Sequence, residues 1–446
     1  MAGALLGVTL AYLNTTVAWA APPLTLDQAV EQALARAPEL RAATLARAEA
    51  EARLAQTQTA AWPRAMAEAS YTPHWPINAI RLPQTPGGPT LTPRPVDDVH
   101  RYQLSLSVTE RLVDLSRGGR EAAAREGVRQ SEAAGELAAA RLAYGVRVAF
   151  CGTLFAREVA RIAGDALTQA RREAQRAELR LTAGAGTQVG LAQARGRVAE
   201  LEAELRRAEV QQLRQRRVLA NLLGVTTLPP LSGRLELLAG AEPAGGAGPA
   251  SPALSPEGTP AVRQLRAAQR SAVHAARSQA RTFVPILSLA ASAGLRYPRA
   301  LALEFGPVLE GAAVLSWEAF DSGLRRARVR EGEAQALRFG AQAEATAREL
   351  ERELIEVEAR AASAAADLVS ARETLRQNEL YLRVARAAVE AGTGTELDVH
   401  QAQLALDRTR IAIQRALLEA ALAEAQRLLV WGRTRPPVAD EAGGER

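Results

Sequence analysis

The chain has 446 residues, of which 48% are hydrophobic but only 4% aromatic, and its 55 basic and 49 acidic side chains leave a formal net charge of +6. Every basic residue is an arginine, and the arginines alternate with glutamates, as in Arg171-Arg172-Glu173, instead of clustering among aromatic residues. This pattern predicts solvated helix faces and argues against a nucleic-acid-binding protein. A single cysteine, Cys151, excludes an intrachain disulfide framework, and the four histidines match no metal motif, so we predict neither a cofactor nor a metal.

The first residues have the pattern of an export signal. Residues 1–17 are apolar and uncharged, and Ala18-Trp19-Ala20 resembles a cleavage site of small residues. We therefore predict that residues 1–20 are a signal peptide. No later run of about 18 apolar residues remains, which predicts that the mature chain has no transmembrane helix. It would then either be soluble outside the cytoplasm or cross a membrane as strands.

A helix and a hairpin open the first structural repeat, which we place at residues 21–224. The helix is predicted from Leu24 to about residue 59, with Thr25 as its N-cap and Pro63 beyond its end. A β-hairpin is predicted over about residues 65–113, with a proline-rich exposed loop at 73–98. Its second strand alternates strictly from residue 102 to 109, which predicts one apolar and one polar face.

A long helical hairpin completes this repeat, over about residues 118–223. The pattern is helical and free of proline from residue 120 to about 181. About 62 residues of helix would form a rod of about 90 Å, which no ordinary globular core requires. An Ala-Gly break at 183–187 then predicts a tight turn, and a second helix returns over about 188–223.

The same plan starts again after a Pro- and Gly-rich segment at 225–258, which we interpret as a linker or equatorial segment. The second repeat, residues 259–432, is predicted to contain a helix at about 260–282 and a β-hairpin at about 286–317. A short turn is expected near Tyr297-Pro298. A long helical hairpin from about 322 to 430 follows, with its break at 391–395. The polar tail at 433–446 is predicted to be flexible.

The two halves superimpose at an offset of 208 residues, which carries Thr187 onto Thr395 and Gln193 onto Gln401. Apolar and small residues then recur at spacings of three and four, the mark of a coiled-coil packing seam. In the first half the seam comprises Leu191, Ala194, Val198, Leu201, Leu205 and Ala208, and in the second Val399, Ala402, Leu406, Thr409, Ile413 and Ala416.

The number of strands constrains how this chain could cross a membrane. Each half offers two strands of about 8 to 10 residues, the length of a membrane-spanning β-strand. Four strands cannot close a barrel, for which about eight are needed, and lipid does not tolerate open sheet edges. If these strands span a membrane, several chains must therefore share one barrel. The alternative is a soluble protein in which two hairpins cap a helical bundle.

The chain resembles the TolC-type outer-membrane efflux protein family, also called the outer membrane factors. The resemblance rests on Leu24–Val30 (LTLDQAV), on the strand exit Trp317–Gly323 (WEAFDSG), and on the two Ala-Gly-x-Gly-Thr turns, the second of which continues as Glu396–Ala402 (ELDVHQA). The resemblance implies a mainly α fold with a small β part. Long helical hairpins would form an α-barrel through the periplasm. Four strands per chain would complete a 12-stranded β-barrel in a homotrimer, surrounded by outer-membrane lipid.

The family pattern also suggests a gate, and this chain departs from the family pattern in two places. Many members carry two acidic residues near the second helix turn, whereas this chain has Asp398 and then Gln401. Gly190 and Gln193 occupy the corresponding positions in the first half. A threefold ring of Asp398 would attract cations at a constriction. The alternative is that Asp398 only caps the returning helix. The proline that usually stands in the strand exit is replaced by Arg111 and Glu318, so the bend is expected to differ.

The two turns are interpreted as periplasmic tips that meet an adaptor protein, although their glycines are also what a tight turn needs. These tip residues are Gly184, Gly186, Thr187, Gly392, Gly394 and Thr395. The sequence thus predicts a passive exit duct of a tripartite efflux or type I secretion system. It would be driven by an inner-membrane transporter, because no phosphate-binding loop motif is present. Two other readings are a periplasmic coiled-coil adaptor and an enzyme on a helical scaffold.

Overall fold

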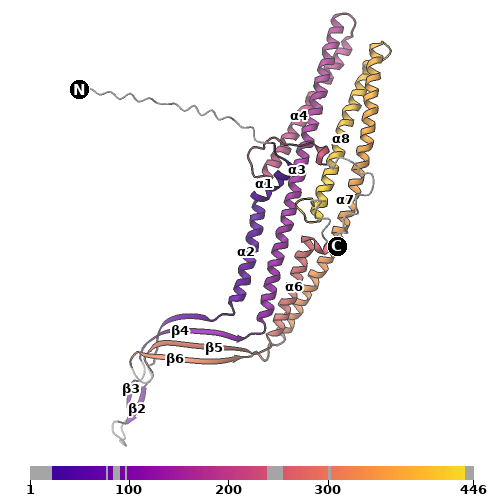
Figure 1. The fold of residues 1–446 in the computed structure, drawn as a ribbon. Coiled ribbons are helices and arrows are strands. Elements are labelled where there is room, and N and C mark those ends of the chain that lie inside the picture. Colours follow the sequence, from indigo (N-terminus) through magenta and orange to yellow (C-terminus); the bar gives the residue numbers. More distant parts are fainter. Residues whose placement is uncertain are drawn as a thin grey trace, which may run out of the picture.

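The computed structural model describes residues 23–76, 79–83, 91–95, 98–238, 255–299 and 303–436. The predicted signal peptide and the tail beyond residue 436 lie outside this range. Long, nearly parallel helices form a rod, and a narrow four-stranded sheet leaves one end of it at an angle (Figure 1). The two helical hairpins end at the opposite pole, so the sheet and the hairpin tips are the two ends of an elongated molecule.

The N-terminal helix differs from its prediction, because it is broken in two. Helix α1 (Leu26–Arg36) begins at the predicted N-cap Thr25, whose hydroxyl accepts from the Gln28 backbone while the Gln28 side chain accepts from the Thr25 backbone. Ala37 then adopts an extended conformation, and α2 (Pro38–Thr59) starts at the next residue. Proline disfavours helical geometry in the residue before it, which explains the break.

The first long hairpin consists of α3 (Arg117–Thr182) and α4 (Gln188–Leu222), and α3 alone is about 100 Å long. The predicted seam packs these helices together. Leu201 is buried against Ala166, Leu167 and Ala170 of α3, and Val198 lies at the edge of the same cluster. Half-exposed surfaces elsewhere on the hairpin carry Arg–Glu pairs, as the alternating charges predict.

The second repeat follows the same plan. Helix α6 (Pro260–Arg281) packs between α3 and α7, and α7 (Leu324–Glu390) forms the second long hairpin with α8 (Glu396–Val430). Its seam residues Val399, Ala402 and Leu406 pack on Leu382 and Ala385 of α7. Farther along, the half-buried Asn378 side chain donates to the hydroxyl of the buried Thr409 at 2.8 Å, which places a polar pair inside the seam.

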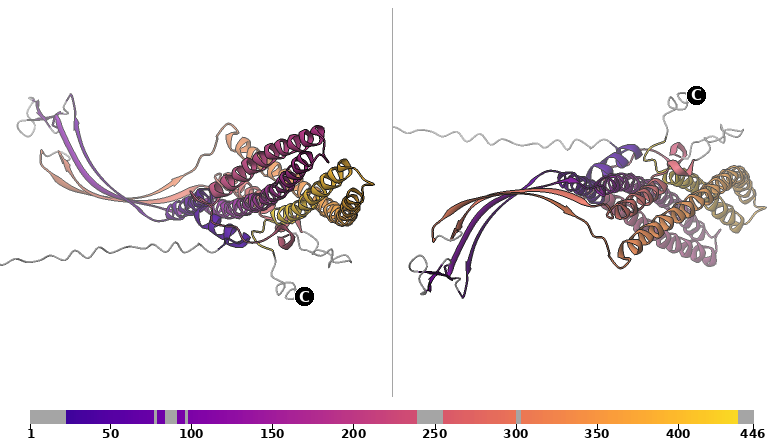
Figure 2. Two further views of the ribbon diagram at one scale, coloured as in Figure 1. Left: turned by 90° about the horizontal axis from the view of Figure 1, so that it is seen from above. Right: turned by 90° about the horizontal axis from the view of Figure 1, so that it is seen from below.

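The sheet has the order β1-β4-β5-β6 and is antiparallel throughout. Its strands are β1 (Arg64–Pro73), β4 (His100–Val113), β5 (Ile286–Tyr297) and β6 (Gly306–Ser316). The hairpins of the two repeats therefore meet at β4 and β5, and β1 and β6 are the free edges. The strands twist and curve together away from the helices (Figure 2).

The sequence predicted an exposed loop without strands at residues 73–98, and this prediction is wrong. The segment contains a second, two-stranded sheet of β2 (Ala79–Pro83) and β3 (Leu91–Pro95), which extends the β1–β4 hairpin beyond the main sheet (Figure 1). Prolines suggested a loop, but both strands of a two-stranded ribbon are edge strands, and an edge strand tolerates residues that cannot donate.

The described parts of the middle segment, residues 225–238 and 255–258, and the start of the tail contain contacts that the sequence did not predict. Leu231 forms a parallel bridge with Leu24, and helix α5 (Leu235–Leu238) buries Leu235, while η1 (Pro256–Gly258) leads into α6. At the other end, the Arg147 side chain donates to the Thr434 carbonyl at 2.9 Å, and Arg435 forms an ion pair with Glu31. The described part of the tail is therefore held against α1 and α3.

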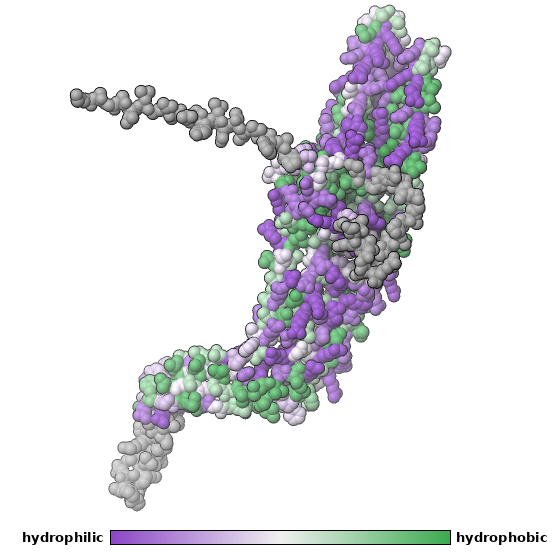
Figure 3. All heavy atoms as spheres, in the orientation of Figure 1, coloured by the Kyte–Doolittle hydropathy of each residue, from purple (hydrophilic) through white to green (hydrophobic). Residues whose placement is uncertain are grey.

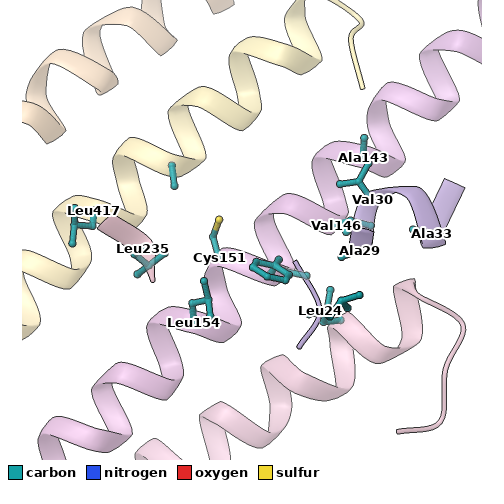
Figure 4. Close-up of a cluster of buried hydrophobic side chains, with 14 of the residues drawn as sticks. Leu24, Ala29, Val30, Ala33, Ala143, Val146, Cys151, Leu154, Leu235 and Leu417 are labelled. Atoms are coloured by element: carbon teal, nitrogen blue, oxygen red, sulfur yellow. The ribbon is translucent and has the colours of Figure 1, made fainter. Parts of the chain in front are cut away.

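The main core lies where α1, α3, α4, α5 and α8 meet (Figure 4). Phe150, Leu219 and Leu417 are fully buried there, and removal of one such large side chain would cost roughly 3–5 kcal/mol. Cys151 points into this cluster as a buried small residue, as expected, and burial raises the pKa of its thiol to about 11. One stretch of α3 is apolar enough to cross a membrane by composition, but half of it is buried inside the molecule.

Candidate functional site

The two hairpin tips have the same backbone construction. Gly184 and Gly392 follow the ends of α3 and α7 with φ angles of 74° and 72°, a left-handed conformation that glycine adopts without strain. The turn closes through bonds back into the helix, from Ala185 to the Arg180 carbonyl and from Thr393 to the Ala388 carbonyl, each at 2.9 Å. These glycines therefore have a structural role in the tight turn, which was one of the two interpretations of the sequence beside adaptor contact.

A second glycine in each turn is required by close packing. A Cβ on Gly186 would lie 2.7 Å from the Leu181 backbone nitrogen, and a Cβ on Gly394 would lie 2.8 Å from the Ala388 Cβ. The next residue, Thr187 or Thr395, is the N-cap of the returning helix. Both turns are therefore rigid, compact and nearly identical.

Asp398 has a defined capping role. It is the third residue of α8, not its N-cap, and its carboxylate accepts from the Thr395 backbone at 3.0 Å and from the Thr395 hydroxyl at 2.6 Å. The hydrogen bond from the Thr395 hydroxyl, and after it the bond from the Thr395 backbone, hold the pKa of the Asp398 carboxyl below its ordinary value. The carboxylate is therefore ionised at neutral pH. Both of these bonds are accepted by the same carboxylate oxygen, Oδ2, so the cap uses one of the two oxygens.

The other three residues of the predicted gate have no comparable contact. Gly190 donates its backbone N–H to the Thr187 hydroxyl at 3.1 Å, so the first repeat keeps half of this cap without the carboxylate. Gln193 and Gln401 are exposed. The hydrogen bonds described for Gly190 and for Asp398 each stay within their own hairpin.

One contact at the tips was not predicted from the sequence. Arg180, near the end of α3, forms an ion pair with Glu396, the first residue of α8, and this pair joins the two hairpins. At the offset of 208 residues, Ala388 and Gln188 take the corresponding positions, so the pair occurs only once. Because the partners are far apart in sequence and belong to no motif, no local pattern could reveal them.

A second polar cluster surrounds Asp407 on α8, where this helix faces α3 and α4. This carboxylate is mostly buried and accepts from the Gln403 side chain at 3.2 Å, with Arg410 at 3.8 Å. A small hollow beside it is lined by α3, α4 and α8, and includes Arg197, His400 and Glu173. Burial raises the pKa of the Asp407 carboxyl above its ordinary value, although the Gln403 bond and the two arginines oppose this.

The sheet has one apolar and one polar face, as the alternation predicts. Leu104, Leu106 and Val108 of β4 lie on the same face as Ala291, Ala293 and Leu295 of β5, while serines occupy much of the other. Hydrophobic side chains cover the sheet and hydrophilic ones cover much of the visible face of the helices (Figure 3). The surface therefore changes character where the strands meet the helices.

Aromatic clusters mark both ends of this apolar face. Tyr71, Tyr102 and Tyr297 meet at the far end, with ring centroids 5.1 and 6.1 Å apart, and Phe283 meets Trp317 beside the helices at 6.1 Å. Along β4 about ten residues separate the two levels. At about 3.3 Å per residue and a tilt of about 40°, this corresponds to roughly 25 Å, the height of a barrel's apolar band.

A membrane-facing sheet joined to a periplasmic helical duct defines a class of outer-membrane channels. The sequence pattern of the outer membrane efflux protein family matches residues 29–225 and 254–433, and the chain belongs to this family. It is accordingly an outer-membrane efflux channel with helices that extend into the periplasm. The assignment gives no support to the adaptor reading, and the family is one of transport ducts rather than enzymes.

Solved structures show the same fold at low sequence identity. The CusC channel is 18% identical, with a TM-score of 0.76 over 92% of each chain. VceC of Vibrio cholerae is 18% identical, with a TM-score of 0.72 over 92% of this chain and 96% of its own. The open MtrE channel of Neisseria gonorrhoeae is 19% identical, with a TM-score of 0.74 over 92% and 89%. No curated protein matches the chain.

Proposed function

We propose that three copies of this chain close one 12-stranded β-barrel and continue it as a helical tunnel, which acts as the passive exit duct of an efflux or type I secretion system. The observation that carries this proposal is the open sheet. Strands β1 and β6 have unpaired edges, while one face of the sheet is apolar along its length. Lipid does not tolerate such edges, and three sheets of four strands satisfy them by pairing β6 with β1 of the next chain.

Exposed apolar side chains on the helices support the same assembly. Val210 and Leu213 of α4 are 68% and 49% exposed, and Ile355 and Val369 of α7 are 67% and 56% exposed. These helices form opposite sides of the helical layer, since α4 contacts α3 and α7 contacts α6 and α8. A threefold ring would pair the α4 side of one chain with the α7 side of the next and remove these residues from water.

The gate of this duct would lie beside the hairpin tips. Threefold symmetry turns Asp398 into a ring of three carboxylates, each with one oxygen outside its cap. Gln401, Gly190 and Gln193 would line the same level without adding charge. A multivalent cation would bridge the carboxylates and obstruct the duct, because like charges held close together attract cations.

The partners would be a periplasmic adaptor protein and an inner-membrane transporter. The tip turns, with Gly184, Gly186, Gly392 and Gly394, present a compact and rigid end. Val189 and Leu397 are 66% and 61% exposed in the first turns of the returning helices. Exposed apolar residues beside a rigid turn suit the packing of another helical hairpin. The adaptor would hold the tips apart, and the transporter would supply the energy.

Two measurements on the purified protein test this function. Membranes are extracted with detergent, and the mass of the detergent-stripped oligomer is measured. We expect three chains. The same preparation is added to a planar lipid bilayer, where we expect stepwise conductance. A water-soluble monomer that forms no conductance would contradict the duct. Conductance from an assembly of another size would retain the duct and reject the trimer.

A further inference from the structure

The charges of the sheet all lie on one face, with a single exception. Residues that pair directly across two strands lie on the same face of the sheet. Arg64 pairs with Thr109, Gln103 pairs with Arg296, and Ser292 pairs with Glu310, so all six lie on one face. This is the face that would line the barrel. The outward face carries one carboxylate, Glu110, beside Leu289. The charged residues of the inward face are Arg64, Glu68, Arg101, Arg111, Arg296 and Glu310.

The signs on the inward face are unequal. Within the four strands, four arginines and two glutamates share this face, a surplus of two positive charges in each chain and of six in a trimer. The arginines lie at both ends of the strands, Arg64 and Arg111 near the helices and Arg101 and Arg296 near the far end. Glu310 is 3.7 Å from Arg296, and Asp114, just beyond β4, is 3.9 Å from Arg111, so each carboxylate neutralises part of an arginine's charge. Glu68 lies between the two ends of the strands, beside Ser105.

Lipid excludes charge of either sign from the outward face. This explains why the charges point inward, but it does not explain the surplus of arginine. The inward side chains between the charges are small, chiefly serine, threonine and alanine, so the guanidinium groups are the longest groups on this wall. In a water-filled cylinder with a low-dielectric wall, fixed charges of one sign concentrate solutes of the opposite sign.

We propose that the arginines of the inward face make the barrel selective for anions, so that the duct favours small anionic organic solutes over cations. This inference rests on the proposed trimeric duct and specifies its substrate class. The barrel and the gate would then act differently. The Asp398 ring binds cations that obstruct the periplasmic end, whereas the barrel sets which permeant charge leaves most readily.

The test measures the reversal potential of single ducts in a planar bilayer under a potassium chloride gradient. Arg296→Gln removes three positive charges from the trimer, and we expect the permeability ratio of chloride to potassium to fall by about two-fold. Glu68→Gln should raise the ratio. The matched control is Glu110→Gln, the same change on the outward face, which should leave it unchanged. Unchanged ratios in both inward variants, or an equal change in the control, would overturn the proposal.

A second measurement avoids variants that alter assembly. Ser105→Cys places a thiol on the inward face, and the native Cys151 is buried and unreactive in the folded chain. Modification of the assembled duct with a negatively charged thiol reagent should lower the chloride preference, and a positively charged one should raise it. Leu106→Cys on the outward face is the control. Absence of conductance in the unmodified protein would contradict the proposed duct, whereas conductance that ignores both reagents would contradict only the anion preference.

Discussion

Arg180 on α3 and Glu396 on α8 form an ion pair across the two helical hairpins, at the pole of the molecule farthest from the sheet. Their side chains remain 52% and 63% exposed, so the pair adds little to the stability of the fold. It does, however, connect two hairpins that share no apolar cluster at this level. A weak link between two elements that separate on opening can bias the opening equilibrium without affecting folding.

Loss of this pair should therefore favour the open duct. Arg180→Gln and Glu396→Gln are each expected to raise the mean conductance in planar bilayers, with no change in melting temperature. The exchanged double variant Arg180→Glu with Glu396→Arg should restore the native conductance, because the attraction is rebuilt. A double variant that conducts like either single variant would show that the pair does not hold the hairpins together.

Asp398 should determine the block by multivalent cations. Asp398→Asn is expected to weaken the block strongly, because it removes all three carboxylates of the ring. Thr395→Ala is the matched control. It removes the cap, at a cost of about 1 kcal/mol, but keeps the charge, so block should persist. The lowered pKa predicts that block in the native protein survives moderate acidification and is lost only below the ordinary aspartate range. Equal block in native and Asp398→Asn ducts would remove Asp398 from the gate.

Asp407 should make the stability of the fold pH-dependent. Burial raises the pKa of its carboxyl, so the folded chain binds this proton more tightly than the unfolded chain does. The charged form therefore destabilises the fold at neutral pH, and this penalty is relieved as pH falls through the folded pKa towards 3.8.

The variant Asp407→Asn tests this sign. It is expected to melt at a higher temperature than the native protein at neutral pH, and the difference should shrink on acidification. Asp367→Asn, at an exposed position of α7, serves as the control and should show no such trend. A variant that is less stable at neutral pH would mean that the pairing with Arg197 and Arg410 outweighs the burial of the charge.

Cys151 should be a probe of unfolding. Burial in the core raises its pKa to about 11, so almost no reactive thiolate exists at neutral pH. A thiol reagent should leave the folded trimer unmodified and label the chain fully in denaturant. Rapid labelling of the native protein would show that the core around Phe150 opens locally.

The sequence was most informative where periodicity and turn chemistry are local. The helical hairpins, the seam around Leu201 and Leu406, and the two glycine turns all follow from spacing within about 40 residues. The contacts missed are those between distant segments. Arg180 meets Glu396, Arg147 reaches Thr434, and Leu24 pairs with Leu231 only because the fold brings them together. Composition also misled at residues 73–98, where prolines concealed a pair of edge strands.

Gly294 should control assembly of the barrel. A Cβ at this position on β5 would lie 2.2 Å from the Leu104 carbonyl oxygen and 2.9 Å from the Ser105 Cα, both backbone atoms of β4. The two repeats meet along this strand pair, so an added methyl group would force apart the centre of the sheet. Gly294→Ala is expected to cost about 1–3 kcal/mol and to reduce the yield of assembled trimer in the outer membrane. Gly311→Ala on β6 is the matched control, because its Cβ would meet no atom within 4 Å. The comparison is the fraction of each variant that migrates as an oligomer before heating in detergent. If both variants assemble as well as the native protein, the close approach at Gly294 does not constrain the barrel.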